Sequence, residues 1–169
     1  MSHYFTHTQI ILGTIVLISD GNALTGLFFE KQKNMPHLDS LQQNDIPLFS
    51  LVKQQLAEYL GGTRQQFQIP LTPTTGTAFQ QRVWNALAKI PYGSTLSYRQ
   101  LAEHIGAPKS VRAIAHATGC NPISLIIPCH RIIGSNGKLV GYAGGLERKQ
   151  MVLDIEKKNS LSHANILYS

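Results

Sequence analysis

The run Ile127-Pro128-Cys129-His130-Arg131 places a thiol, an imidazole and a guanidinium at consecutive positions. A thiolate is the reactive form of cysteine, and a neighbouring base or positive charge lowers the pKa of a thiol. We therefore interpret Cys129 as the candidate nucleophile and His130 as the candidate base or proton relay. Neighbouring side chains of an extended chain point to opposite sides, so their contact requires a turn after Pro128 or a bridging water. The alternative is a buried structural cysteine with an unrelated histidine beside it.

Composition narrows the class of protein. A chain of 169 residues, 43% hydrophobic and 14% charged, can form one ordinary globular domain or two small ones. No run approaches the ~20 apolar residues of a membrane span, and the N-terminus lacks the pattern of a signal peptide. We therefore expect a cytoplasmic protein with no membrane partner. Cys120 and Cys129 are expected to be reduced, since a disulfide between them would close a very short loop and remove the nucleophile.

Charge is distributed unevenly along the chain. Residues 1–75 contain four basic and five acidic side chains, whereas residues 76–169 contain eleven basic and four acidic ones. A basic half that carries the candidate nucleophile indicates a polyanionic partner, of which a phosphate backbone is the obvious example. A solvated basic surface without a partner is the alternative.

The first half, residues 1–75, predicts an α/β N-terminal domain made of a small sheet and a helix. Two β-rich stretches around turn residues predict a hairpin, and helical spacing of apolar residues predicts a helix that ends at Gly61-Gly62. The expected elements are strands within 8–18 and 23–29 joined at 19–22, a loop at 30–45, a helix at Pro47–Leu60, an edge strand at Phe67–Leu71 and a linker at 72–76. None of these elements carries evident chemistry.

The second half, residues 76–169, predicts a mostly α C-terminal domain. Thr77 with Gln80, and Ser97 with Gln100, have the spacing of a capping box, in which two side chains satisfy each other's backbone amides. The expected helices are 77–90, Ser97–Ile105 and Lys109–Thr118. A short turn joins the last two helices, which is typical of a helix-turn-helix that binds DNA. An ordinary pair of packed helices is the alternative.

The second helix of this pair carries Lys109 and Arg112 among small residues such as Ala113. Small side chains allow close approach to a narrow minor groove, and Arg112 is the one long side chain that could probe it.

The chain around the thiol predicts further elements. These are an extended run from Asn121-Pro122 to Cys129, a hairpin pairing Ile132-Ile133 with Lys138–Val140, a flexible glycine loop at 141–145, a helix from Leu146 to about Lys158 with Leu146, Met151, Val152 and Ile155 facing inward, and a frayed tail at 159–169. Glu156 follows Val152 by four residues, so it lies near the buried edge of the last helix and could reach a partner there. A solvated glutamate is the alternative.

Several motifs, taken together in order and spacing, resemble the O6-alkylguanine-DNA alkyltransferase family, also called methylated-DNA–protein-cysteine methyltransferases. They are Thr77-Ala78-Phe79-Gln80, Val83-Trp84, Ile90-Pro91-Tyr92-Gly93, Ser97-Tyr98, Val111-Arg112-Ala113, Asn121-Pro122, Ile127-Pro128-Cys129-His130-Arg131, Tyr142 and Gly144-Gly145-Leu146. The strong resemblance covers about residues 76–158, and the first half resembles the family's α/β domain more weakly.

The resemblance implies a single-turnover repair protein that flips an alkylated base out of double-stranded DNA. Cys129 would take the alkyl group from O6 of guanine, and also from O4 of thymine, to form a stable thioether. The catalytic set it implies is Cys129, His130, Glu156 and Asn121, with His130 acting through a water, Glu156 orienting the imidazole and Asn121 fixing the turn. The implied DNA-binding residues are Arg112, Tyr98, Lys109 and Ala113, and the implied substrate pocket is Tyr98, Ile132, Tyr142, Ala143 and Gly144.

We expect no cofactor and no metal. Some relatives bind zinc through cysteines of the N-terminal half, but this half has only His3, His7 and His37 as comparable ligands. Thr118-Gly119-Cys120 replaces bulkier or basic residues of some relatives, which predicts weaker DNA affinity. We expect a monomer and leave cooperative loading on DNA open. A non-enzymatic lesion sensor and a cysteine hydrolase using Cys129 and His130 are the rival functions.

Overall fold

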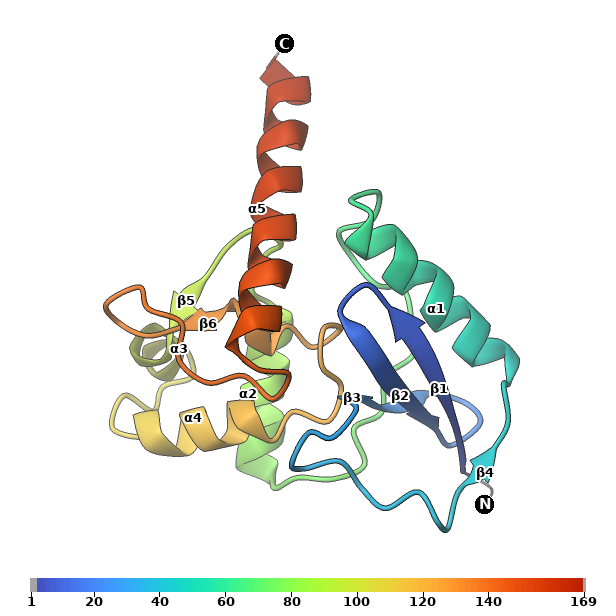
Figure 1. Ribbon diagram of the computed structural model, residues 1–169. Helices are drawn as coiled ribbons and strands as arrows, with labels where there is room; N and C mark the ends of the chain where they lie inside the picture. Colours follow the sequence, from blue (N-terminus) through green and yellow to red (C-terminus); the bar gives the residue numbers. More distant parts are fainter. Residues whose placement is uncertain (1–2, 169) are drawn as a thin grey trace.

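The computed structural model describes residues 3–168, with side chains to Ser160 in the last helix. Its larger sheet has the strand order β3-β2-β1-β4. The strands are β1 (Tyr4–Ile10), β2 (Gly13–Ser19), β3 (Leu24–Phe29) and β4 (Gln42–Gln43), of which β4 alone runs parallel to its neighbour, β1. In Figure 1 this sheet and helix α1 (Pro47–Leu60) lie on one side. Helices α2 (Ala78–Ala88), α3 (Tyr98–His104) and α4 (Val111–Gly119) lie on the other, together with the start of α5 (Leu146–Tyr168).

The predicted hairpin is present as β2 and β3, but the prediction of one strand within 8–18 was wrong. The chain turns at Ile11-Leu12, so Ile10 pairs with Gly13 and the stretch forms parts of two antiparallel strands. Gly13 has a φ of 117°, a conformation that favours glycine. Two apolar residues at the turn hid it from the sequence pattern.

Successive side chains of strand β2 point to opposite faces of the sheet, and apolar residues occur on both, so both faces are covered. Ile15 and Leu17 join the main core, whereas Val16 and Ile18 face a small second cluster. Partly buried Met35, Leu38 and Leu41 from the loop after β3 pack on that second cluster. The segment expected to be a polar loop therefore covers the outer face of the sheet.

Helix α1 has the predicted bounds, with a proline in its first turn and Gly61 at its C-cap. The predicted edge strand at Phe67–Leu71 is reduced to one parallel bridge between Leu24 and Leu71. Pro70 supplies a carbonyl to Leu24 N at 2.8 Å but has no amide to extend the ladder.

The second half contains α2 (Ala78–Ala88), α3 (Tyr98–His104) and α4 (Val111–Gly119). Both predicted capping boxes are present, at Thr77 and at Ser97. Helix α4 begins at Val111, two residues later than predicted. The indole of Trp84 in α2 donates to the carbonyl of Ala117 in α4 at 2.8 Å, so the helix pair is fixed to its support.

Three predictions near the C-terminus were wrong. Strand β6 (Ile132–Ile133) pairs in parallel with β5 (Leu96–Ser97), not with Lys138–Val140, which contributes only a turn hydrogen bond from Gly134 N to Lys138 O. Helix α5 extends over Leu146–Tyr168, so the backbone of the expected frayed tail is helical through Tyr168. The inward face of α5 is also different, because Lys149, Val152 and Glu156 are buried while Leu146 and Met151 are exposed.

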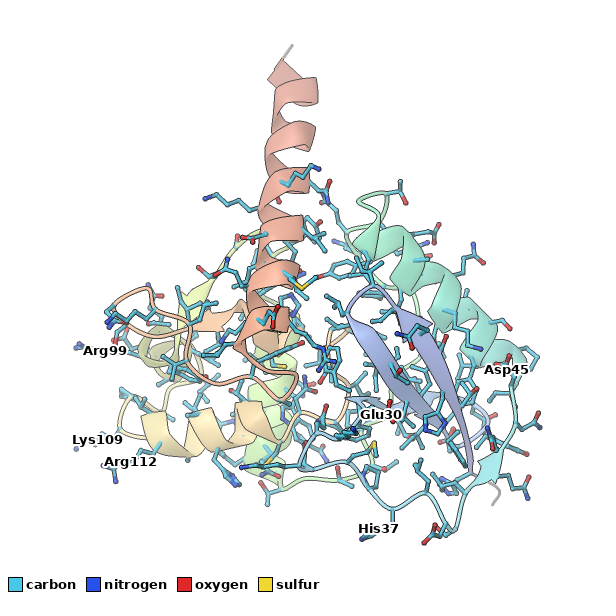
Figure 2. The ribbon with its side chains drawn as sticks, viewed as in Figure 1. Glu30, His37, Asp45, Arg99, Lys109 and Arg112 are labelled. Carbon is cyan, nitrogen blue, oxygen red and sulfur yellow. The ribbon has the colours of Figure 1, made fainter. Side chains whose placement is uncertain are left out.

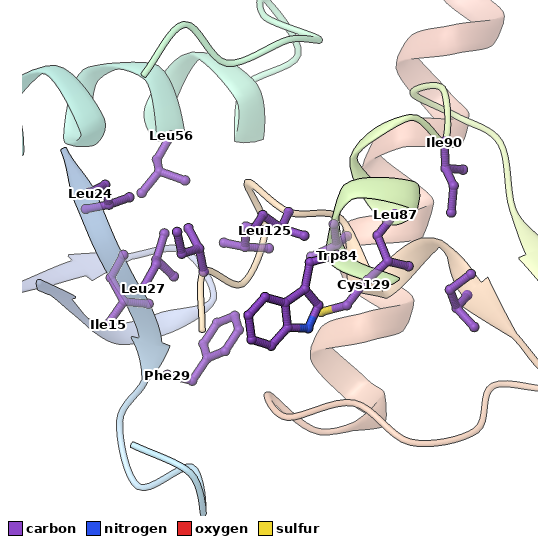
Figure 3. Packing of buried hydrophobic residues seen from close by; sticks show 14 of the residues in the cluster. Ile15, Leu24, Leu27, Phe29, Leu56, Trp84, Leu87, Ile90, Leu125 and Cys129 are labelled. Carbon is purple, nitrogen blue, oxygen red and sulfur yellow. The ribbon is translucent and has the colours of Figure 1, made fainter. Parts of the chain in front are cut away.

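One apolar core connects the two halves. Figure 3 shows Leu125 between the strand residues of the first half and Leu87 and Ile90 of the second. The backbone of Leu27 also exchanges hydrogen bonds with Pro122 and Ser124, which places the segment leading to Cys129 along the edge of the sheet. The division into domains at 75/76 remains a prediction across this shared core. None of the helices in the described part of the chain is long and apolar enough to cross a membrane.

Candidate active site

The segment before the cysteine is held in an unusual path by one buried amide. Asn121 Nδ2 donates to the carbonyl of Ile127 at 2.8 Å, and its Oδ1 accepts from the amide of Ile123 at 3.0 Å. Between these contacts Leu125 has a φ of 70°, which is uncommon for a residue with a side chain. Asn121 therefore closes the loop that delivers Cys129 to its position, the geometry the sequence predicts for it.

Cys129 begins a short 3-10 turn, η1 (Cys129–Arg131), and lies at the wall of a cavity of about 410 Å³. Its exposed fraction is only 4%, so the thiol is reached through this cavity. Four separate segments line it: the loop after β3, the start of α3, the end of α4 and the glycine loop. They contribute Lys31, Gln32, Lys33, Asn34, Tyr98, Ala115, Thr118, Gly119, Gly141, Tyr142 and Ala143.

His130 is fully buried and contacts Glu156, as the resemblance implies. Its Nε2 lies 2.7 Å from Oε2 of Glu156. A carboxylate only accepts, so Nε2 carries the proton and Nδ1 keeps a free lone pair. Nδ1 is buried and has no hydrogen-bond partner within the described residues. Burial and the charges of Arg131 and Lys149 lower the pKa of His130, and the contact with Glu156 raises it. The net shift of this pKa is downward, so the imidazole is neutral and able to accept a proton.

Glu156 is the centre of the buried polar cluster. Its Oε1 accepts from Arg131 Nε at 2.9 Å and Gly93 N at 3.2 Å, and its Oε2 accepts from Arg131 Nη2 at 2.9 Å and from the hydroxyl of Tyr59. Burial would raise the pKa of this carboxyl, but the hydrogen bonds from His130 and Arg131 outweigh it and hold the pKa well below its usual range. The carboxylate is therefore charged and fixed on several sides.

The resting cysteine is a thiol. Burial raises the pKa of Cys129, while the Asn121 side chain, the charge of Lys149 and the residue's own amide oppose that rise. No hydrogen bond joins Cys129 Sγ directly to His130 among the contacts of residues 3–168.

The glycine loop that completes the cavity is fastened by its backbone. Lys149 is fully buried, and its Nζ donates to the carbonyls of Val140 and Gly141 at 3.2 and 3.1 Å. The hydroxyl of Tyr98 donates to the same Val140 carbonyl at 3.1 Å. Burial lowers the pKa of Lys149 to about 8, although the nearby Cys129 opposes the shift.

The structure brings together part of the expected substrate pocket. Tyr98, Tyr142 and Ala143 line the cavity with Cys129. Ile132 and Gly144 do not line it, because Ile132 is buried in β6 and Gly144 packs on Phe29.

The expected DNA-binding residues in α4 and in the turn just before it lie outside the cavity. Lys109, Arg112 and Ala113 are exposed, and Figure 2 shows Lys109 and Arg112 on the same side of the molecule as Arg99. Asp45 lies on the opposite side. Arg99, Lys109 and Arg112 therefore form a basic surface beside the helix pair, on the opposite side of the molecule from Asp45.

Three buried groups were missed from the sequence: Tyr59, the role of Arg131 as a partner of Glu156, and Lys149. Lys149 could have been recognised, because it shares one helical face with Val152 and Glu156. Tyr59 has no such signal, since it reaches Glu156 only through tertiary packing. Among the described residues, no three His, Cys, Asp or Glu side chains are grouped as metal ligands.

A helix-turn-helix beside a cavity with a cysteine in its wall defines the class of DNA alkyltransferases that the resemblance indicated. Two family models agree: "6-O-methylguanine DNA methyltransferase, ribonuclease-like domain" matches residues 3–73, and the DNA binding domain of the same family matches residues 78–158. The chain belongs to the 6-O-methylguanine DNA methyltransferase family.

Individual relatives give the same result. The methylated-DNA–protein-cysteine methyltransferase of Haemophilus influenzae is 43% identical over 155 residues, covering 91% of this chain and 86% of that protein. The constitutive protein of that name from Bacillus subtilis is 38% identical, over an alignment that covers 92% of this chain and 96% of the Bacillus protein. The crystal structure of Mycobacterium tuberculosis OGT in complex with DNA superposes with a TM-score of 0.86, at 41% identity, covering 92% of this chain and 94% of that one.

Proposed function

We propose that this protein repairs DNA by transferring an alkyl group from O6 of guanine to the sulfur of its own Cys129. The observation that carries the proposal is a buried thiol at the wall of a cavity with the His130–Glu156 pair behind it. The named relatives are methyltransferases, so they favour an enzyme over the lesion sensor and the cysteine hydrolase.

The first step is removal of the base from the helix. A thiol with an exposed fraction of 4% cannot reach a base inside a duplex, so the nucleotide must rotate into the cavity. Arg112, exposed on α4, fills the vacated stack, and Lys109 contacts phosphate. Tyr98, at the N-terminus of α3 and on the cavity wall, crowds the target nucleotide and assists its rotation.

The second step is transfer. The neutral His130 accepts the thiol proton at Nδ1 through a bridging water, and the charged Glu156 stabilises the imidazolium that forms. The thiolate then attacks the alkyl carbon in line. The S–C bond forms as the C–O6 bond breaks, and the guanine that leaves takes a proton from the hydroxyl of Tyr98. Solvent returns a proton to Tyr98 as the His130 imidazolium releases the one it took from the thiol, so the net transfer is of one proton from Cys129 to guanine. The thioether is stable, so each molecule acts once.

We further propose a monomer that works on double-stranded DNA in the cytoplasm. Both cysteines are free, which suits a reducing compartment.

Intact mass after mixing with a duplex that contains O6-methylguanine tests the function. We expect a gain of one methyl group per chain, and no further gain when DNA is in excess. A matched Cys120→Ser variant should react like the wild type. No gain at stoichiometric DNA would support a sensor instead, and continued turnover would contradict the single-use mechanism.

A further inference from the structure

The glycine loop forms one wall of the cavity without a helix or strand to hold it. Lys149 fastens its beginning, at Val140 and Gly141. Its end is fastened by the preceding residue of α5, since Arg148 Nη1 donates to the carbonyl of Gly144 at 3.2 Å. Two consecutive cations thus hold the two ends of the segment that presents Tyr142 and Ala143 to the cavity.

Arg148 also reaches the other half of the molecule. Its Nε donates at 2.6 Å to the carbonyl of Leu12, in the turn between β1 and β2. Its guanidinium carbon lies 4.9 Å from the centre of the Phe29 ring, at the end of β3. The Phe29 ring in turn contacts the Tyr142 ring edge to face, with 6.0 Å between centroids. One guanidinium therefore joins the N-terminal sheet to the cavity wall by two routes.

Two glycines leave the space that this arrangement needs. A Cβ at Gly13 would lie 2.7 Å from Arg148 Nη2, and a Cβ at Gly144 would lie 2.7 Å from the ring of Phe29. Real Cβ atoms do not approach other atoms so closely, so a side chain at either position would displace the guanidinium or the loop. The fork of arginine, with donors in fixed directions, suits two carbonyls better than an ammonium does.

We propose that Arg148 is a positioning residue through which the N-terminal sheet sets the wall of the base-binding cavity. This inference rests on the proposed function and assigns the N-terminal half a part in alkyl transfer, although it supplies no reacting atom. Arg148 acts through Gly144, Phe29 and Tyr142 and does not touch the alkylated base.

The distinguishing consequence concerns small substrates. Arg112 and Lys109 serve the duplex, whereas the cavity wall serves the base itself. Loss of the Arg148 contacts should therefore slow the reaction with free O6-benzylguanine by the same factor as the reaction with O6-methylguanine in a duplex. A misplaced reacting group costs on the order of 10- to 100-fold in rate, which is the size of the fall expected for Arg148→Met.

The experiment compares single-turnover rates at saturating substrate with the dissociation constant for duplex DNA. Arg148→Met should lower the maximal rate on both substrates and leave the dissociation constant unchanged. Arg148→Lys keeps the charge but holds one carbonyl rather than two, so it should recover only part of the rate. Arg64→Met, which breaks a surface ion pair with Glu58 in the first half, is the matched control and should react like the wild type.

The outcomes separate the two proposals. If the wild-type protein transfers no alkyl group, the proposed function fails. If the wild type transfers and folded Arg148→Met retains the wild-type maximal rate, the inference is wrong. A loss confined to the duplex substrate would also overturn it. If Arg148→Met does not fold, the folded Arg148→Lys variant tests the inference instead. Wild-type rates in Arg148→Lys would contradict the positioning role of Arg148.

Discussion

The buried cluster around Glu156 and the exposed surface formed by Lys109 and Arg112 at the start of α4 are both polar. They differ in how their side chains are held. Each group of the cluster is fixed by hydrogen bonds, with His130, Arg131 and Tyr59 all converging on one carboxylate. Lys109 and Arg112 make no side-chain hydrogen bond or ion pair within the described residues 3–168. In the proposed mechanism, the groups assigned to chemistry are therefore preorganised, whereas the groups assigned to a polyanion are left free for it.

The largest expected effect comes from the buried side. Cys129→Ala removes the acceptor, so transfer from O6-methylguanine duplex should be abolished while duplex binding is retained. Methyl transfer by intact mass and binding by fluorescence anisotropy measure the two properties separately. Loss of both would mean that the cavity and the surface around Arg112 are not independent of each other.

Glu156→Gln should destabilise the fold by about 3–5 kcal/mol at neutral pH, because Arg131 is left buried without its counter-charge. The pKa of Glu156 is lowered from 4.5 in the folded protein, since the hydrogen bonds from His130 and Arg131 outweigh burial. Its stabilisation is therefore complete above about pH 4.5 and is lost as the pH falls through the folded-state value. Urea unfolding at several pH values measures this. A stability difference that stays constant down to pH 3 would contradict the charge of Glu156 as its cause.

Arg112→Ala tests the exposed face. Unstacking a base costs a few kcal/mol, so losing the side chain that fills the gap should slow duplex repair on the order of 10- to 100-fold. The reaction with free O6-benzylguanine should be unchanged, in contrast to Arg148→Met. Single-turnover kinetics on both substrates measure the ratio. Equal slowing on both would remove the role of Arg112 in the stack.

The smallest expected effect is that of Lys109→Ala. Each phosphate contact adds about −0.9 to the slope of log affinity against log salt, so the variant should flatten that slope by about one unit. Lys53→Ala is the matched control, because Lys53 pairs with Asp45 on the opposite side of the molecule. If both variants flatten the slope equally, the basic face does not contact DNA specifically.

The helix-capping signals were read correctly from the sequence, whereas pairings between distant segments were not. The capping boxes at Thr77 and Ser97 are formed by residues three positions apart, so the sequence contains all of their information. The partner of β6 and the contact of Tyr59 with Glu156 depend on segments that are distant in the sequence. Ile11-Leu12 gave no turn signal because apolar residues occupy the turn.

The residues of the candidate site also fall into those with a sequence signal and those without one. The sequence motif and the resemblance identified Cys129, His130 and Glu156, and the structure brings His130 and Glu156 into contact. Their catalytic roles remain proposals. Arg148 and Tyr59 had no signal, since each acts only through segments brought together by folding.

Location of the alkyl group within the protein tests the central claim most directly. After reaction with a duplex containing O6-methylguanine, the protein is digested and the peptides carrying Cys120 and Cys129 are compared by mass spectrometry. The account predicts one methyl group, on Cys129 alone, at one per chain. A methyl group on Cys120, or an unmodified Cys129 peptide after complete repair of the DNA, would contradict it.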